Sequence, residues 1–351
     1  MPRKLFAFSR RFFAFCFLLL IFLSACTPTP ASDAPYAPGF FYLSTSPNAQ
    51  LFLLDEPTSA PRQPIPLNPP TDCSFYALRP APRGRWIAVE WECVSGPAVE
   101  LLDTSNGKTH FALANPAIDS RFLAWQPDGR SLYLKIGTLS VPQTLRIDAA
   151  SGQATELPLS AFVYDLTVSP DGQRLLYSLS KGLGFGSETW LAGPNGENPS
   201  QLLLDAQNIT ALAQFSPDGR QIAFIKLPDN QVSAPPGELW VMASDGQNPR
   251  YLATADAGRG FAPVWSPDGT KIAFVGRDQP EKPEAVNLSI YDLTQATLST
   301  VQAALSTAPA WSPDGARIAY TSDKMELWFY EIASQQVSQG TSGACCAGWI
   351  R

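Results

Sequence analysis

The chain has 351 residues, of which 45% are hydrophobic and 16% are charged, and it contains 33 prolines and 24 glycines. This composition is more typical of an all-β protein with many turns than of a helical or disordered one. The net charge of −6 argues against nucleic acid or an anionic membrane surface as the partner, because both repel an acidic protein. We therefore expect no nucleic-acid partner.

Residues 1–25 have the features of an export signal, in which basic residues precede an apolar run from Phe12 to Leu23. That run is shorter than the ~20 apolar residues that a transmembrane helix needs. The segment ends in Leu23-Ser24-Ala25-Cys26, which resembles a bacterial lipobox, whose cysteine is acylated and becomes the mature N-terminus. We expect an exported protein, anchored to the membrane through a lipid on Cys26 and facing the periplasm or the cell exterior.

Residues 26–38 are rich in proline, threonine and alanine and contain one charged residue. Such a segment is expected to form an extended tether between the anchor and a folded domain. Short β-like runs separated by turns begin at Phe40 and continue to the end of the chain. The sequence therefore divides into a signal peptide (1–25), a tether (26–38) and one β domain (39–351).

One turn recurs along the β domain: Ser-Pro-Asp-Gly between two apolar runs, as in Trp311-Ser312-Pro313-Asp314-Gly315. Proline presets φ, and aspartate and glycine are favoured at the positions that follow in a tight turn. Related copies occur at Gly129, Gly172, Gly219 and Gly269, and a degraded copy reads Pro82-Arg83-Gly84. These glycines are 43 to 50 residues apart, a period that is typical of the blades of a β-propeller.

A second strand type recurs seven times, against six copies of the turn. These strands are Gln50 to Leu54, Val99 to Leu102, Gln143 to Ile147, Glu188 to Ala192, Glu238 to Met242, Asn287 to Tyr291 and Glu326 to Tyr330. Phe40 to Leu43 lacks a preceding inner strand, and Cys345 to Ile350 resembles an inner strand with nothing after it. We therefore expect an all-β, seven-bladed propeller of four-stranded antiparallel blades, closed by both termini. A six-bladed ring is the alternative.

Ser-Pro-Asp-Gly followed by Ile-Ala-Phe or a close variant, and then by a Leu-Trp strand, resembles the TolB-type β-propeller repeat. The resemblance covers about residues 39–351 and implies a propeller fold, an extracytoplasmic compartment and a binding or scaffolding role. The sequence departs from TolB in two ways. TolB carries an α/β domain before its propeller, whereas only about a dozen residues separate Cys26 from the first strand here. The TolB propeller has six blades, whereas we expect seven.

The residues needed for catalysis are sparse. The one histidine, His110, is expected on an outer strand, the Gly-x-Ser-x-Gly motif of hydrolases is absent, and no His, Cys or acidic cluster has metal-ligand spacing. We expect a non-catalytic protein without a cofactor or metal, binding a protein, a peptide or a cell-envelope polymer. The alternative is a glycan-processing enzyme that uses carboxylates facing the central channel, about 5 to 10 Å apart.

The connections opposite the recurring turns are long and unequal, and loops that vary on a regular scaffold often carry function. Three examples are Ser178 to Glu188, Leu227 to Glu238 and Gly276 to Asn287. The candidate ligand contacts on this face are Trp91, Lys181, Phe185, Asp229, Arg259 and Arg277.

Four cysteines remain beyond the signal and Cys26, so three pairings are possible. Cys73 and Cys93 lie ten residues on either side of a hairpin centred on residue 83, which places them opposite each other on adjacent strands. We favour a disulfide between these two, with Cys345 and Cys346 left as a vicinal pair or as free thiols. The alternative joins Cys73 to Cys345 or Cys346, across the expected junction of the two chain ends.

Overall fold

The computed structural model describes residues 39–44, 49–112, 119–137, 142–230, 236–256, 260–279, 282, 285–301 and 305–350. All of them belong to one compact unit, Pro35–Arg351. The expected signal peptide, Cys26 and the tether as far as Ala34 fall in the separate unit Met1–Ala34, and residues 1–38 lie outside the described residues. Within the described ranges, no helix has the length and apolar character needed to cross a membrane.

Antiparallel strands form groups of four, and in most groups the strands pair in chain order. One group contains β4 (Cys73–Pro80), β5 (Trp86–Cys93), β6 (Gly96–Asp103) and β7 (Lys108–Ala112). The next contains β8 (Asp119–Trp125), β9 (Ser131–Gly137), β10 (Gln143–Asp148) and β11 (Ala154–Glu156). A third contains β12 (Val163–Val168), β13 (Leu175–Ser180), β14 (Ser187–Ala192) and β15 (Ser200–Asp205).

Two further groups are joined into an eight-stranded sheet through one residue pair, Ala255 with Gly276. The first contains β16 (Asn208–Phe215), β17 (Gln221–Pro228), β18 (Pro236–Ala243) and β19 (Arg250–Asp256). The second contains β20 (Val264–Trp265), β21 (Lys271–Arg277), β22 (Val286–Asp292) and β23 (Thr297–Val301). A separate sheet contains β24 (Ala310–Trp311), β25 (Arg317–Thr321), β26 (Glu326–Glu331) and β27 (Gln336–Ser342).

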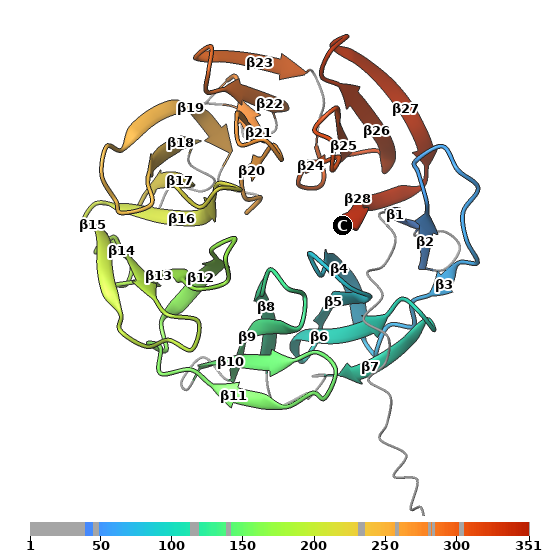
Figure 1. The fold of residues 1–351 in the computed structure, drawn as a ribbon, viewed down its shortest axis with the longest axis horizontal. Helices are drawn as coiled ribbons and strands as arrows, with labels where there is room; N and C mark the ends of the chain where they lie inside the picture. The colour runs from blue at the N-terminus through green and yellow to red at the C-terminus, as the bar shows by residue number, and fades with distance from the viewer. Residues whose placement is uncertain are drawn as a thin grey trace, which may run out of the picture. The chain divides into compact units, whose positions relative to one another are not determined.

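The remaining sheet combines the two ends of the domain. Its strand order is β28 (Ala344–Ile350), β1 (Gly39–Ser44), β2 (Gln50–Leu54) and β3 (Ile65–Pro66). Phe40 pairs with Trp349 and Leu43 with Cys345, so the expected pairing of the last strand with the first is confirmed. Within this unit, the sheets lie around a common centre (Figure 1).

The recurring turn is held by its own side chains. In the last copy, the Ser312 hydroxyl donates to Asp314 Oδ1 (2.6 Å) and accepts from the Arg317 amide (3.0 Å). The Gly315 amide donates to the Ser312 carbonyl (2.9 Å), and Gly315 has φ 71°, a conformation that favours glycine. The serine hydrogen bond also lowers the pKa of Asp314. The aspartates are therefore turn residues, as the sequence predicted.

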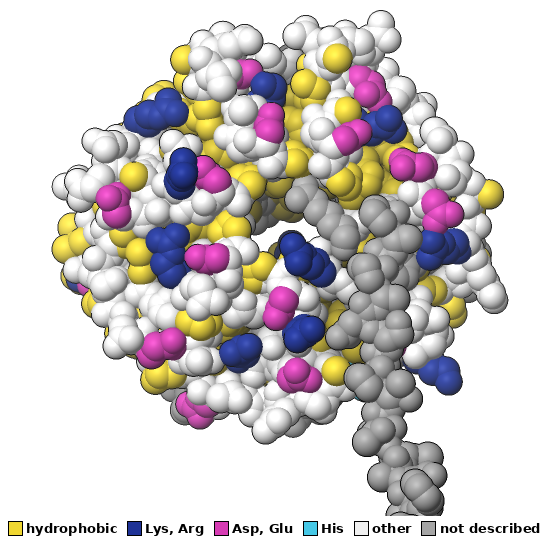
Figure 2. All heavy atoms as spheres, in the orientation of Figure 1, with side chains coloured by type: hydrophobic (Ala, Val, Ile, Leu, Met, Phe, Trp, Pro, Cys, Tyr) yellow, Lys and Arg dark blue, Asp and Glu magenta, His cyan; other side chains and the backbone are white. Residues whose placement is uncertain are grey.

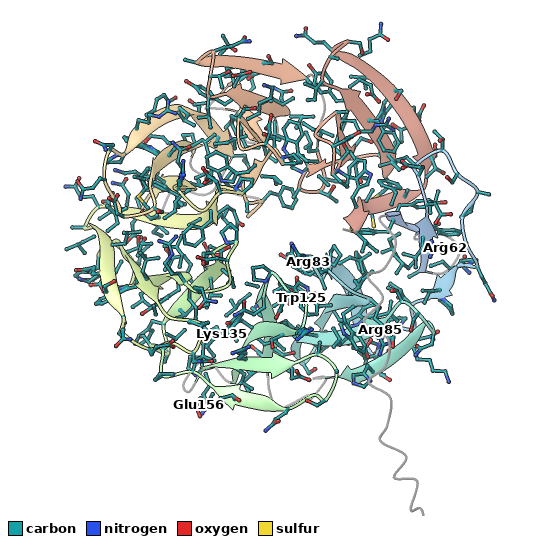
Figure 3. All side chains as sticks on the ribbon, in the orientation of Figure 1. Arg62, Arg83, Arg85, Trp125, Lys135 and Glu156 are labelled. Atoms are coloured by element: carbon teal, nitrogen blue, oxygen red, sulfur yellow. A yellow bond between two sulfur atoms is a disulfide. The ribbon has the colours of Figure 1, made fainter. Side chains whose placement is uncertain are left out.

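The aromatic residue before each turn links neighbouring sheets. The indole nitrogens of Trp125, Trp265 and Trp311 donate to backbone carbonyls 46 to 51 residues earlier, at distances of 2.9 to 3.1 Å. All three side chains are buried, and Trp125 is labelled in Figure 3. These residues form the core between sheets, as expected, and are not available to stack on a ligand.

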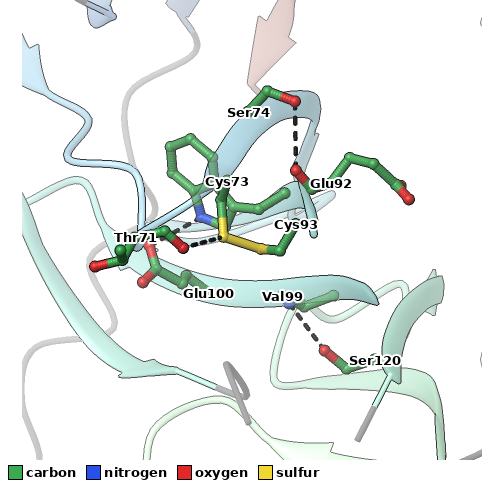
Figure 4. Close-up of a disulfide and its surroundings, with 9 residues drawn as sticks. Thr71, Cys73, Ser74, Glu92, Cys93, Val99, Glu100 and Ser120 are labelled. Carbon is green, nitrogen blue, oxygen red and sulfur yellow. Dashed lines mark hydrogen bonds between the residues drawn. A yellow bond between two sulfur atoms is a disulfide. The ribbon is translucent and has the colours of Figure 1, made fainter. Parts of the chain in front are cut away.

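Cys73 and Cys93 lie opposite each other on β4 and β5, as the position of the turn between them predicted. The structure joins them in a disulfide (Figure 4). Cys345 and Cys346 are the free cysteines of the described residues. Below, the end of the sheets that carries the Ser-Pro-Asp-Gly turns is called the turn end, and the opposite end the loop end.

Candidate functional site

Three of the candidate contacts come together at the loop end. Lys181 and Phe185 lie in the loop between β13 and β14, and Asp229 follows β17 in the next sheet. Asp229 Oδ2 accepts a hydrogen bond from the Gly186 amide (2.8 Å), which ties the loop to that sheet. Gly186 has φ 74°, and a Cβ there would lie 1.9 Å from the Asp205 carbonyl oxygen, so only glycine fits. The loop is therefore fixed at its C-terminal end.

Large apolar side chains project from this loop region into solvent. Phe162, Leu183 and Phe185 are 68%, 62% and 67% exposed, and we call them the loop-end patch. The Phe162 carbonyl accepts a hydrogen bond from the Ser180 amide (3.4 Å), which places Phe162 beside the start of the loop. Single exposed apolar residues are common on protein surfaces, whereas a cluster of them is typical of an interaction site.

A charged group borders the patch. Lys181 Nζ lies 3.1 Å from Glu188 Oε1, while Glu188 Oε2 accepts a hydrogen bond from the Trp190 indole (3.0 Å). The hydrogen bonds from Trp190 and Lys181 lower the pKa of Glu188. Lys181 is thus part of an exposed ion pair, and it can still contact a ligand at modest cost because such pairs are weak.

Two of the sequence-based candidates are wrong. Trp91 and Arg277 are only 1% and 2% exposed. Trp91 packs between its own sheet and the sheet that contains both chain ends, and its indole donates to Glu100 Oε2 (3.0 Å). Arg277 Nη2 lies 2.5 Å from Asp256 Oδ1 in a buried ion pair. Both residues belong to second strands, whose two faces are covered by neighbouring sheets. The sixth candidate, Arg259, lies outside the described residues.

Sequence reasoning missed a polar cavity at the turn end, which we call the turn-end notch. Its volume is about 370 Å³, and it lies between the β4–β7, β8–β11 and β12–β15 sheets. Its polar lining consists of Arg83, Gln126, Asp128, Arg146, Asp171 and Gln173. In Figure 2, basic and acidic side chains lie side by side around the centre of the visible face, and Figure 3 labels Arg83 near that centre.

The notch is formed where the recurring turn departs from its consensus. Arg83 replaces the aspartate of the turn, and Gln126 replaces the serine. The Gln126 side-chain Nε2 donates to the Tyr133 hydroxyl (2.6 Å), which in turn donates to the Pro194 carbonyl of the next sheet (2.8 Å). Arg83 is exposed, and its guanidinium forms no ion pair within the described residues. The degraded copy of the turn was the sequence signal for this cavity.

A second hollow, of about 460 Å³, lies at the loop end beside the disulfide. Its lining runs from Pro70 to Cys73 and from Cys93 to Ala98. Val94 on its rim is almost fully exposed. The loop end therefore offers apolar surface at two places, and the turn end offers a polar cavity.

His110 and Asp165 are two titratable residues that bear on the question of catalysis. His110 lies on the outermost strand β7, where its Nε2 contacts the Ala150 carbonyl oxygen (2.6 Å) and its ring packs on Trp86. Among the described residues, no group of three His, Cys, Asp or Glu side chains could hold a metal ion. Asp165 on the inner strand β12 accepts a hydrogen bond from the Ala213 amide (3.1 Å). Burial of its carboxyl group raises the pKa of Asp165.

Comparison with known proteins identifies the repeat. Residues 188–328 match the family model of the TolB beta propeller domain. The described sheets are also similar to solved β-propeller structures. TolB from Acinetobacter baumannii aligns with a TM-score of 0.52 and 17% identity over 90% of this chain and 83% of that one. A search of the curated proteins found no significant match.

Enzymes occur among the similar structures as well. An oligogalacturonate lyase in complex with manganese aligns with a TM-score of 0.59 and 13% identity, covering 78% of this chain and 80% of the lyase. A Mycobacterium tuberculosis puromycin-hydrolyzing peptidase aligns with a TM-score of 0.61 and 12% identity, covering 89% of this chain and 53% of the peptidase. At these identities the similarity concerns the fold alone. The expected TolB-type repeat is confirmed.

Proposed function

We propose that this TolB-like β-propeller is a lipid-anchored binding or scaffolding module outside the cytoplasm, which holds a protein, a peptide or a cell-envelope polymer without catalysing a reaction. The observation that carries this proposal is the loop-end patch of Phe162, Leu183 and Phe185. A rigid scaffold presents Leu183 and Phe185 on a loop that Asp229 holds at its C-terminal end, and Phe162 lies beside the start of that loop. Large apolar side chains exposed together stabilise a complex by the water they release on binding.

We further infer that the domain is a closed ring of seven blades. Each of the seven groups of four strands then corresponds to one blade, and the sheet of β28, β1, β2 and β3 is the blade that both chain ends complete. The pairing of Phe40 with Trp349 supports closure, because it satisfies backbone groups of both strands. In a six-bladed ring, β1 to β3 would have no inner strand.

The anchor fits this arrangement. As the second strand of its blade, β1 begins at the turn end, where Gly39 pairs with Ile350. Extended at about 3.3 Å per residue, the twelve residues between Cys26 and Gly39 reach roughly 40 Å. A tether of that length attached at the turn end leaves the loop end, and with it the patch, accessible to a partner.

The proposal is tested with the full-length protein in its own membrane. Proteins and envelope polymers are crosslinked to it, captured with it and identified by mass spectrometry. We expect serine at Phe162, Leu183 and Phe185 to lower partner recovery at least about ten-fold, as expected for the loss of a few buried apolar contacts. The control places serine at three other exposed apolar positions, which lie on outer strands: Leu204, Leu298 and Val337.

Equal recovery with the two triple variants would refute binding through the loop end. The anchor is tested in the same membranes with Cys26→Ser, which should leave the precursor unprocessed or release the protein from the membrane fraction. An unmodified mature N-terminus at another residue would contradict the lipid anchor. Turnover of a captured polymer by the purified protein would favour the enzyme alternative instead.

A further inference from the structure

The remaining pair of cysteines has an unusual geometry. Cys345 and Cys346 lie on β28, the inner strand of the sheet that combines both chain ends. The Cys346 thiol donates to Cys345 Sγ across 3.1 Å. Cys345 is buried, whereas Cys346 is partly exposed. The two sulfur atoms are therefore in direct contact, and one of the two residues can be reached from solvent.

This contact depends on a break in the strand. Successive side chains of a regular strand point to opposite faces, so neighbouring cysteines cannot touch. Between Phe41 and Leu43, however, the register of β1 with β28 shifts. Cys346 lies at this irregularity with φ 56°, a left-handed conformation that is uncommon for a residue with a Cβ. The irregular backbone brings both sulfur atoms together.

The surroundings favour thiol–disulfide chemistry. Cys345 belongs to a buried apolar cluster against which Cys346, Cys73 and Cys93 all pack. Four sulfur atoms thus share one region between the sheet of the chain ends and the β4–β7 sheet, and two of them already form a disulfide. The hydrogen bond from Cys346 lowers the pKa of Cys345 and raises the pKa of Cys346 itself. A thiolate attacks disulfides whereas a thiol does not, so Cys345 is the more reactive group of the contacting pair.

We propose that Cys345 and Cys346 close to a vicinal disulfide, a second cross-link in addition to Cys73–Cys93. The oxidant is a low-molecular-weight disulfide. One cysteine thiolate attacks a sulfur of the oxidant, which releases one thiol and leaves a mixed disulfide on the protein. The neighbouring cysteine then attacks the protein sulfur of the mixed disulfide and displaces the second thiol. In total, the protein loses two S–H bonds and gains one S–S bond, and the oxidant is reduced to two thiols.

This cross-link acts differently from the hairpin disulfide. A bond between adjacent residues closes no loop in the unfolded chain, so it adds little stability through chain entropy. Instead, it fixes the irregular backbone at Cys346 and removes the two thiols that could attack Cys73–Cys93. The inference uses only the sheet of the chain ends and is independent of the partner and the lipid anchor.

The test uses the purified full-length protein in buffers of graded glutathione to glutathione-disulfide ratio, quenched with N-ethylmaleimide. Unreduced trypsin digestion leaves both cysteines in one peptide, residues 325–351. We expect this peptide to lose both maleimide adducts as the buffer becomes more oxidising and to have the mass of the dithiol less two hydrogens. Cys73 and Cys93 should remain linked to each other throughout.

Two results would overturn the proposal: two maleimide adducts on residues 325–351 at every ratio, or a peptide that links Cys345 or Cys346 to Cys73 or Cys93. The variant Cys346→Ser serves as the control, because its remaining thiol has no adjacent partner and should keep one adduct in the reduced protein. The measurement on the wild-type protein decides the question even if this variant folds poorly.

Discussion

Replacing Arg277 by methionine should destabilise the protein strongly, because it removes the guanidinium that lies against the buried Asp256 carboxylate. Arg277 Nη2 and Asp256 Oδ1 are 2.5 Å apart, and both side chains are only 1% exposed. Removing one member of a buried pair typically costs about 3 to 5 kcal/mol. In a chain of this size, 1 kcal/mol lowers the melting temperature by about 2 °C, so we expect a fall of about 6 to 10 °C.

Differential scanning calorimetry and urea denaturation measure this loss. The control is Arg317→Met, because the Arg317 pair with Glu331 is longer (3.4 Å) and about one-third exposed. Such a pair contributes at most about 1 kcal/mol. The double variant Asp256→Leu/Arg277→Met should recover most of the stability, since an apolar pair of similar volume needs no charge compensation.

The position of the ion pair explains why its loss should lower the stability of the whole domain. Among the residues that the structure describes, Ala255 and Gly276 form the one backbone pairing between the β16–β19 and β20–β23 groups, and the ion pair joins the next residue of each strand. The reasoning is refuted if Arg277→Met is no more destabilising than Arg317→Met. It is also refuted if the double variant is less stable than Arg277→Met, because the cost would then come from lost volume and not from the loss of the ion pair.

Three further predictions follow from the same structure. Serine at both Cys73 and Cys93 should lower the free energy of unfolding by about 3 kcal/mol in urea titrations, because the bridge closes a loop of 20 residues; an unchanged midpoint under non-reducing conditions would contradict this. Hydrogen bonds from serine lower the pKa of Asp171, Asp218 and Asp314, so the contribution of these carboxylates to stability is complete above about pH 4 and is lost as the pH falls through their folded-state pKa values. Thermal unfolding across pH 2 to 6 should therefore show a melting temperature that falls on the acid side, and Asp314→Asn should make this fall smaller. A variant with the wild-type pH profile would refute the role of the Asp314 hydrogen bond. Deleting residues 344–350 should expose the edge of β1 and cause concentration-dependent association in sedimentation experiments, whereas a fully monomeric, equally stable protein would argue against ring closure.

The sequence predicted what depends on local chemistry. The Ser-Pro-Asp-Gly turn is closed by its own serine and aspartate, so four residues were enough to locate it. The position of Cys93 opposite Cys73 follows from counting along a hairpin whose turn was already known. The pairing of β28 with β1 could be predicted because each end of the chain lacked the strand that the other supplied.

The errors concern contacts between sheets. Arg277 was expected at a ligand face because it lies in the long connection from Gly276 to Asn287. Its partner Asp256 lies 21 residues earlier in the neighbouring group, and no local pattern indicates that pairing. Trp91 is covered in the same way by residues from both ends of the domain. The irregularity at Cys346 also depends on the partner strand, so the contact between the two sulfur atoms could not be predicted from their adjacency.

Departures from the repeat are more informative than the repeat itself. A consensus residue stabilises the turn in which it lies. The Asp314 carboxylate, for example, accepts hydrogen bonds from within its own turn. Arg83 stands at the equivalent position, where its side chain cannot accept those bonds, and the residue lines the turn-end notch. Gln126, which replaces the serine of its turn, donates a hydrogen bond to the Tyr133 hydroxyl. Arg83 is therefore the turn residue that the fold leaves available for a ligand, at the end of the domain opposite the loop-end patch.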